Sequence, residues 1–254
     1  MRIDAPTGDR LPALRALWKE AFGDSDAFLD RFYRTAFSAS RCRCATEGER
    51  LLAALYWFDC CYENRRIAYL YAIATAKSDR GRGICHRLME DTHRLLAEHG
   101  YSGAILVPAD ARLFDFYARM GYTACSTIRE VSCHAAEETV VLRRIDEAEY
   151  AMLRRAMLPR GGVVQEAETL AFLSTHAEFY AGKNVLLAAE GEKAHLVGIE
   201  LLGDVESAPR IVRALGYETG TFRTPGDGAP FAMYLPLKEH GIAPPTYFGH
   251  ALDL

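Results

Sequence analysis

Long apolar runs and paired cysteine motifs are missing from this 254-residue chain. Its apolar runs fall well short of the roughly 20 residues that a membrane-spanning helix needs. Residues 1–30 include Asp4, Asp9, Glu20 and Asp24 and lack the apolar core of a signal peptide. The seven cysteines are an odd number and contain no C-x-x-C pair. That pattern argues for reduced thiols and against a disulfide framework or a usual zinc site. We therefore expect a cytoplasmic protein that uses neither a membrane nor a metal ion.

A large excess of charge of one sign is also missing. The formal net charge is −4, so the sequence predicts no strong attraction to nucleic acid or to an anionic membrane. Half of the residues are hydrophobic and a quarter are charged, as is typical of a globular protein, and the length allows one or two domains. The sequence says nothing about the oligomeric state.

Two common phosphate-binding motifs are absent as well. No G-x-x-x-x-G-K-[ST] occurs, and G-x-G-x-x-G fails because His86 stands where a third small residue is required. Residues 69–96 nevertheless read as a buried strand, a turn with the sequence R-G-R-G, and an amphipathic helix. Such a turn presents unpaired N–H groups and the positive end of the helix dipole, which together predict an anion site.

The turn contains Arg80-x-x-Gly83-x-Cys85. This motif resembles the Arg/Gln-x-x-Gly-x-Gly/Ala signature of the GCN5-related N-acetyltransferase (GNAT) family, in which the turn holds the pyrophosphate of coenzyme A. Cys85 departs from the signature, but a thiol is small enough to be tolerated. A second landmark follows about thirty residues later, where LFDFYARMGY (residues 113–122) is similar to a family helix that carries a tyrosine, here Tyr117, and ends at a glycine.

The resemblance implies an α/β (α+β) fold, with a mixed, mostly antiparallel central sheet flanked by helices. It implies acetyl-CoA as the donor substrate, with its pantetheine arm along the strand and its pyrophosphate on the turn. The residues that match these donor-binding positions are Ile73, Ala74, Thr75, Arg80, Gly81, Arg82, Gly83, Ile84 and Cys85. We expect Arg80 and Arg82 to add positive charge opposite the phosphates.

The activity implied is transfer of an acetyl group to a primary amine of a small molecule or peptide. Tyr117 matches the residue that protonates the departing thiolate, and the alternative is that it only covers the core. The general base is left open among Asp59, Glu63, Glu130 and a water chain, and the amine is not specified. A non-catalytic acyl-CoA-binding sensor or scaffold is the alternative function.

The second half suggests a degenerate copy of the first. RIVRALGYET (residues 210–219) is similar to FYARMGYT (residues 116–123), and Arg144-Ile145-Asp146 repeats Arg2-Ile3-Asp4. No pyrophosphate motif occurs after residue 139. We therefore predict a catalytic domain at 1–136 and a second, smaller domain at 137–254 that shapes the acceptor site. Within the latter we expect helices at 146–157 and 165–180, and hairpins at 184–202 and 217–237.

Overall fold

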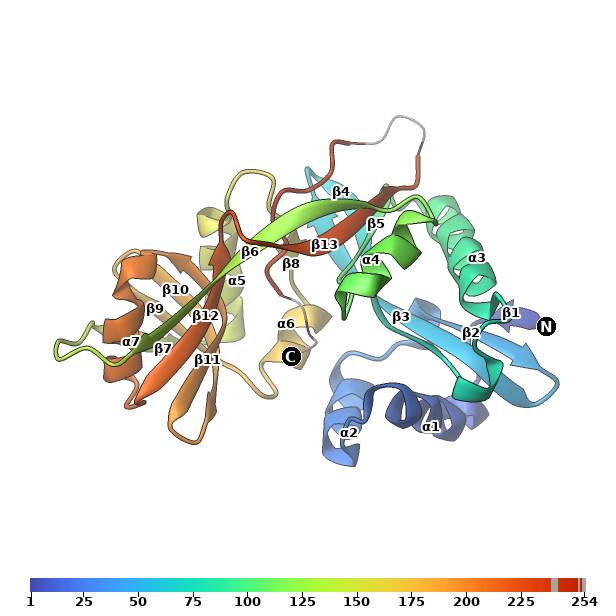
Figure 1. Cartoon of the computed structure of the whole chain (residues 1–254), viewed down its shortest axis with the longest axis horizontal. Coiled ribbons are helices and arrows are strands. Elements are labelled where there is room, and N and C mark those ends of the chain that lie inside the picture. Colours follow the sequence, from blue (N-terminus) through green and yellow to red (C-terminus); the bar gives the residue numbers. More distant parts are fainter. Residues whose placement is uncertain (239–241, 251, 253–254) are drawn as a thin grey trace. The chain divides into compact units, whose positions relative to one another are not determined.

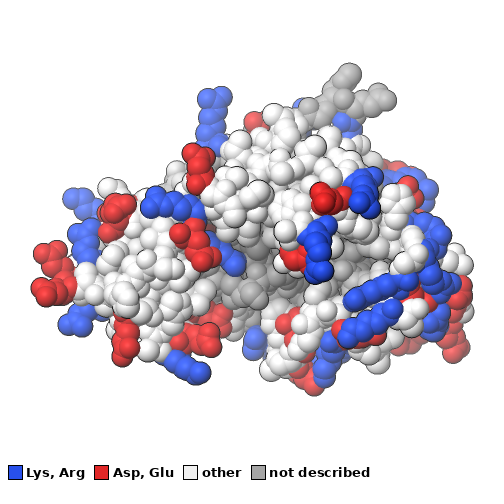
Figure 2. All heavy atoms as spheres, viewed as in Figure 1, with Lys and Arg blue, Asp and Glu red and all other residues white. Residues whose placement is uncertain are grey.

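The computed structural model describes residues 1–238, 242–250 and 252, and the chain forms two compact units. Unit 1 comprises Met1–Thr123 and Tyr234–Pro244, and unit 2 comprises Ala124–Met233 and Pro245–Leu254. The sequence predicts a catalytic domain at 1–136 and a domain at 137–254 that shapes the acceptor site. Those bounds and roles stay a prediction. No helix of the described residues has the length and apolar character to cross a membrane. Acidic and basic side chains are interspersed over the face drawn in Figure 2.

Unit 1 is built on a mixed sheet. Its strands are β1 (Arg2–Asp4), β2 (Cys42–Glu47), β3 (Arg50–Tyr62), β4 (Arg65–Thr75) and β5 (Gly103–Leu106). They lie in this order, every pair antiparallel except the parallel pair β4–β5. The end of β13 (Ala229–Pro236) continues the sheet beyond β5. The sheet is mixed and mostly antiparallel, as predicted.

Helices cover both faces of this sheet (Figure 1). They are α1 (Leu11–Phe22), α2 (Asp26–Thr35), α3 (Ile84–Glu98) and α4 (Ala111–Ala118), with short 3-10 turns η1 (Gly8–Arg10), η2 (Ala39–Arg41) and η3 (Lys77–Asp79). Trp18 of α1 packs on Tyr56 of β3, with ring centroids 5.1 Å apart. Trp57, which points to the opposite face, hydrogen-bonds Tyr101 just after α3. Because both faces are covered, the centre of β3 is apolar without alternation.

The helix boundaries follow local signals in the sequence. Pro12 occupies the first turn of α1, and Gly23 ends that helix with a left-handed φ of 81°. The Ser25 hydroxyl caps α2 by accepting a hydrogen bond from the backbone N–H of Phe28 at 3.2 Å. The ends of both helices are therefore encoded by residues close to them in the sequence.

Unit 2 repeats the mixed sheet. Its strands are β6 (Thr123–His134), β7 (Leu142–Ile145), β8 (Val164–Gln165), β9 (Glu178–Gly182), β10 (Val185–Glu192), β11 (His195–Gly203), β12 (Thr219–Pro225) and the first part of β13, and its helices are α5 (Glu147–Met157), α6 (Glu168–Leu173) and α7 (Ala208–Ala214), with the turn η4 (Val205–Ser207). The sheet order is β7-β9-β10-β11-β12-β6-β13, and β11–β12 is a parallel pair.

Two predicted elements of this half are wrong. The helix expected at 165–180 is instead β8, the short α6 and β9, because only six residues of that segment are helical and Glu178–Gly182 pairs with β10. The hairpin expected at 217–237 does not form. Strand β6, from earlier in the chain, lies between β12 and β13 and pairs with β12 from Thr219 to Pro225.

The two units share one order of strands and helices. The helices that correspond in this order are not α4 and α7, whose sequences are similar. In unit 1, α3 joins the parallel strands β4 and β5, and in unit 2, α7 joins the parallel strands β11 and β12. Helix α7 therefore corresponds to α3 rather than to α4. Val212, which the sequence similarity aligns with Tyr117, does not occupy the place of Tyr117.

The similarity between residues 116–123 and 210–219 arises because helices α4 and α7 end in the same way. Helices α3, α4 and α7 are each followed by a Gly-Tyr pair whose glycine has φ between 81° and 90° and whose tyrosine N–H bonds the carbonyl five residues back, at Gly100-Tyr101, Gly121-Tyr122 and Gly216-Tyr217. The pair marks a helix end and does not identify the helix.

Candidate functional site: the donor loop of unit 1

Strand β4 is distorted near its end. Its register with β3 shifts between Ala54 and Tyr56, so that Ala72 and Ile73 together lie opposite the single residue Leu55. Ala72 has a φ of 48°, an uncommon value for a residue other than glycine. This β-bulge bends the strand and changes the direction of the backbone amides that follow it.

The bulged end of β4 is also a free sheet edge on one side. The parallel pairing with β5 covers only Ile67–Tyr69, whereas β4 continues to Thr75. Within the described parts of the chain, no strand pairs with that side of β4 beyond Tyr69. Ile73, Ala74 and Thr75 therefore lie on a backbone edge that an extended, amide-bearing ligand could join as an additional strand.

The turn after β4 leads directly into the N-terminus of α3. Gly81 and Gly83 have φ values of 78° and 70°, in the left-handed region that glycine adopts without strain. The first backbone N–H groups of α3, at residues 83–86, have no acceptor among the described residues, and no side chain caps the helix. A Cβ placed on either glycine would meet no atom within 4 Å. The loop thus offers a run of unpaired donors beside open space, which suits a pyrophosphate.

The two arginines of the loop differ. The Arg80 side chain donates to the carbonyl oxygen of Thr75 at 3.3 Å, which holds it at the end of β4. The Arg82 side chain pairs with Asp79 and lies 3.7 Å from a carboxylate oxygen of Glu47. The charge that we expected Arg82 to direct at phosphates is therefore already met by two carboxylates.

Cys85 lies in the first turn of α3, against the end of β4. Burial raises the pKa of its thiol to about 11, and a hydrogen bond with Thr75 opposes that rise. A neutral thiol at this position adds no charge to the anion site. Cys85 in place of the small residue of the signature therefore leaves the charge of the anion site unchanged.

Tyr117 lies on α4 and is 7% exposed. Its ring packs edge-on against Tyr122, with centroids 5.9 Å apart. The Tyr122 hydroxyl lies 2.8 Å from Nε2 of His93 on α3. Burial lowers the pKa of His93 to about 4, so this imidazole is neutral near pH 7. The sequence analysis missed the His93–Tyr122 pair because its members are 29 residues apart and share no local motif.

Of the three acidic residues considered as bases, Asp59 is committed elsewhere. Its carboxylate accepts two hydrogen bonds from Arg66, at 3.2 and 2.7 Å, and one from Tyr101. Among the described residues, no group of three or more His, Cys, Asp or Glu side chains is arranged to hold a metal ion.

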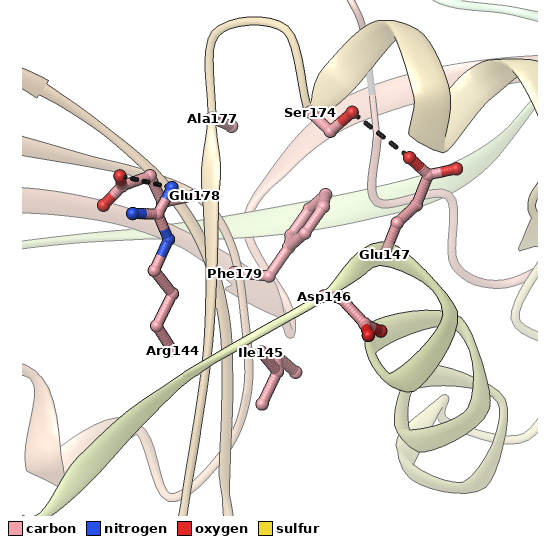
Figure 3. A pocket seen from close by; sticks show the side chains of 8 residues that line it. All are labelled: Arg144, Ile145, Asp146, Glu147, Ser174, Ala177, Glu178 and Phe179. Atoms are coloured by element: carbon pink, nitrogen blue, oxygen red, sulfur yellow. Dashed lines mark hydrogen bonds and ion pairs between the residues drawn. The ribbon is translucent and has the colours of Figure 1, made fainter.

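A separate cavity of about 530 Å³ lies in unit 2, between the end of β7, the start of α5 and the start of β9 (Figure 3). Each of its carboxylates already has a partner. Glu178 pairs with Arg144 at 2.8 Å, and Glu147 accepts from the Ser174 hydroxyl at 3.2 Å. Asp146 caps α5 by accepting from the N–H of Glu149. The cavity therefore has no uncommitted base for acyl transfer.

Unit 2 does not repeat the donor loop. Before α7, Asp204 accepts from the Ser207 hydroxyl at 2.6 Å and lies 3.7 Å from Arg210. Pro209 in the first turn of α7 removes a further backbone donor. No glycine-rich turn separates η4 from α7, so the start of α7 does not offer the backbone donors that the start of α3 offers.

Comparisons with known proteins agree with this geometry. The family model for an acetyltransferase (GNAT) domain matches residues 2–125. A GCN5-related N-acetyltransferase from Kribbella flavida is 18% identical, with a TM-score of 0.71 over 92% of this chain and 70% of that one. One from Anabaena variabilis is 13% identical, with a TM-score of 0.72 over 93% and 73%.

A third similar structure relates to the repeated architecture. It is a tandem GNAT protein from the clavulanic acid biosynthesis pathway, 11% identical, with a TM-score of 0.57 over 93% of this chain and 98% of that one. No curated protein sequence matches this chain.

Proposed function

We propose, from the premise that this chain belongs to the GNAT acetyltransferase family, that it transfers an acetyl group from acetyl-CoA to a primary amine of a small molecule or peptide. The single observation that carries the proposal is the donor loop. Four consecutive N–H groups, at residues 83–86, have no acceptor within the described residues and lie at the start of a 15-residue helix that follows a glycine-rich turn.

Different residues of unit 1 bind acetyl-CoA and activate its thioester. The loop amides and the α3 dipole bind the pyrophosphate, and Arg80, held at Thr75, adds charge beside them. The free edge of β4 at Ile73–Thr75 pairs with the pantetheine amides. A backbone N–H beyond the bulge at Ala72 donates to the acyl oxygen, where negative charge develops as the amine attacks.

Bound acetyl-CoA supplies a thioester, whose acyl group passes to the amine and whose sulfur departs as a thiolate. Tyr117 is the proposed proton donor to that sulfur, since a phenol with an ordinary pKa near 10 can protonate a thiolate as it leaves. The attacking nitrogen loses one proton to a base that we do not assign. The second half of the chain is proposed to shape the acceptor site, because it repeats the connectivity of unit 1 without the glycine-rich turn that would bind a donor.

Two measurements test the proposal. Isothermal titration should show saturable acetyl-CoA binding, and incubation with a panel of amines should release free thiol together with an equal amount of N-acetylated product. Binding without turnover over a broad panel that includes polyamines, aminoglycosides, amino acids and peptides would favour the acyl-CoA sensor. Absence of binding would refute both functions.

A further inference from the structure

Asp79 is a buried carboxylate at the entrance to the donor loop. It ends the η3 turn directly before Arg80, and its side chain is almost inaccessible to solvent. It accepts two hydrogen bonds from Arg50 of β3, at 2.7 and 3.0 Å, one from the Ser78 hydroxyl at 2.8 Å and one from Arg82. One side chain thus ties the loop both to itself and to the sheet.

The charges around Asp79 form a closed group. Arg50 and Arg82 each also approach Glu47, the last residue of β2, at 3.6 and 3.7 Å. Two positive and two negative side chains therefore meet here. The hydrogen bonds from Ser78, Arg50 and Arg82 hold the pKa of Asp79 below its ordinary value, so the carboxylate is ionised near pH 7.

An ionised carboxylate beside a phosphate site is unfavourable by charge alone, since like charges repel. The charge of Asp79 therefore does not explain why it lies beside the loop, whereas the hydrogen bonds that it accepts do. They fix the backbone on the N-terminal side of Gly81 and Gly83, whose left-handed conformations would otherwise be costly to order because glycine is the most flexible residue.

We propose that Asp79 is a positioning residue for the donor substrate: through Arg50 and Arg82 it holds the loop in the conformation in which the N–H groups of residues 83–86 converge on the pyrophosphate. This inference rests on the proposed function, because it takes acetyl-CoA as the ligand of the loop. Asp79 itself touches no reacting atom.

The test uses the full chain with Asp79→Asn, which removes the charge and keeps the shape. Positioning and simple electrostatics predict opposite signs. If Asp79 positions the loop, the Kd and KM for acetyl-CoA rise about tenfold while kcat stays within twofold, and hydrogen exchange accelerates at the bonded amides that flank the loop, those of Ala76, Asp79 and Arg87. If its charge only repels phosphate, acetyl-CoA binds as tightly as before or more tightly, which would overturn the proposal.

Matched variants separate the causes. Arg82→Gln should also weaken acetyl-CoA binding, and the double variant Asp79→Asn/Arg82→Gln should be less than additive, because both residues act through one contact. Asp30→Asn, which alters an exposed ion pair with Arg15, should leave the Kd for acetyl-CoA unchanged. Additive effects of Asp79→Asn and Arg82→Gln would overturn a shared role.

Hydrogen exchange keeps the inference distinguishable from the proposed function. If the wild-type chain does not bind acetyl-CoA, the proposed function fails, yet faster exchange at the amides of Ala76, Asp79 and Arg87 in Asp79→Asn still supports the loop-holding role and unchanged exchange refutes it. Should Asp79→Asn fail to fold, Arg50→Gln removes the anchor to β3 while leaving Asp79 in place, and the same accelerated exchange is expected.

Discussion

Arg154 of α5 and Glu200 of β11 form a two-point ion pair inside unit 2, with Nε–Oε2 and Nη2–Oε1 distances of 2.7 and 2.9 Å. Neither side chain reaches solvent beyond 2%. Tyr150 and Tyr247 donate to the same carboxylate, at 2.8 and 2.9 Å. Glu200 thereby links α5 and the C-terminal segment of the described chain to the sheet.

Breaking this pair should destabilise the protein strongly. Arg154→Met leaves a buried carboxylate without its cation, so we expect a loss of about 3–5 kcal/mol in the free energy of unfolding. The adjacent Arg155→Met is the matched control, because its pair with Glu166 is exposed and such pairs contribute about 1 kcal/mol or less. Urea unfolding of both variants measures the difference, and equal losses would contradict the prediction.

Gly83→Glu should abolish acetyl-CoA binding while leaving most of the structure intact. The side chain meets no atom, so the effect on folding is limited to the cost of a left-handed φ, about 1–2 kcal/mol. Its carboxylate, however, would enter the space in front of the loop N–H groups and repel the pyrophosphate. Titration calorimetry checks the binding.

Gly216→Glu is the control for Gly83→Glu. Gly216 has a φ of 81° and equally open surroundings, but it follows α7 in unit 2. Its substitution should impose similar strain without changing the affinity for acetyl-CoA. Micromolar affinity retained in folded Gly83→Glu would remove the loop from the donor site.

Tyr117→Phe should lower kcat about 10²-fold with little change in the Kd for acetyl-CoA, the range expected when one general acid is lost. Tyr122→Phe is the control, because its hydroxyl bonds His93 and its loss should affect stability more than the chemical step. A single-turnover measurement separates the two effects. An unchanged chemical step in Tyr117→Phe would return Tyr117 to a packing role.

His93 should make stability depend on pH. Its pKa falls from 6.5 to about 4 on folding, so the folded protein disfavours the proton that the unfolded chain binds. Stability is therefore complete above pH 6.5 and declines as the pH falls from 6.5 towards 4. The decline attributable to His93 is about 2 kcal/mol at pH 5, since one pKa unit corresponds to about 1.4 kcal/mol.

The measurement compares urea unfolding at pH 7.5 and pH 5 in the wild type, His93→Gln and His86→Gln. Glutamine cannot titrate but can still hydrogen-bond Tyr122, so His93→Gln should lose the steeper part of the pH dependence. His86 is about half exposed and pairs with the exposed Glu90 at 3.1 Å, so its substitution should change little. Equal slopes in all three proteins would refute the prediction.

One acetyl-CoA should bind per chain. Unit 1 presents the loop donors, whereas the corresponding place in unit 2 holds Asp204 and Pro209. Calorimetry on the full chain should give a stoichiometry of one, and Gly83→Glu should reduce it to zero. A stoichiometry of two in the wild type, or of one in Gly83→Glu, would show that unit 2 binds the donor.

A fragment of residues 1–136 would lack the part of unit 1 that β13 supplies. Unit 1 includes Tyr234, whose ring fills the space over Gly103 on β5. A fragment that ends at residue 136 lacks this strand and should be markedly less stable than the full chain. Any donor affinity that it retains should be measured at low concentration, because the uncovered edge of β5 favours aggregation.

Local signals in the sequence were sufficient for much of unit 1. Ser25, Gly23 and Gly100 set helix ends through contacts within a few residues, and the periodicity of α3 is visible in its sequence alone. The R-G-R-G turn is likewise recognisable from its own residues, although the contact that ties it to Arg50 of β3 is not. Such features are predictable because the interacting groups are close along the chain.

Features that depend on distant pairing were missed or misread. Strand β6 separates β12 from β13 although those two are adjacent in sequence, and β9 became a strand because β10 and β7 pair with it. The bulge at Ala72 arises from the register with β3, which no pattern within β4 reveals.

The sequence by itself determined the donor loop, the helix ends and the mixed α/β character of the chain, because each follows from hydrogen bonds or periodicity over a few residues. Only the tertiary structure decided that Arg82 is paired with Asp79, that α7 corresponds to α3, and that Arg154 meets Glu200. These relationships depend on which strands become neighbours, and the free energy that selects the neighbours is spread over the whole buried core rather than written in any one segment.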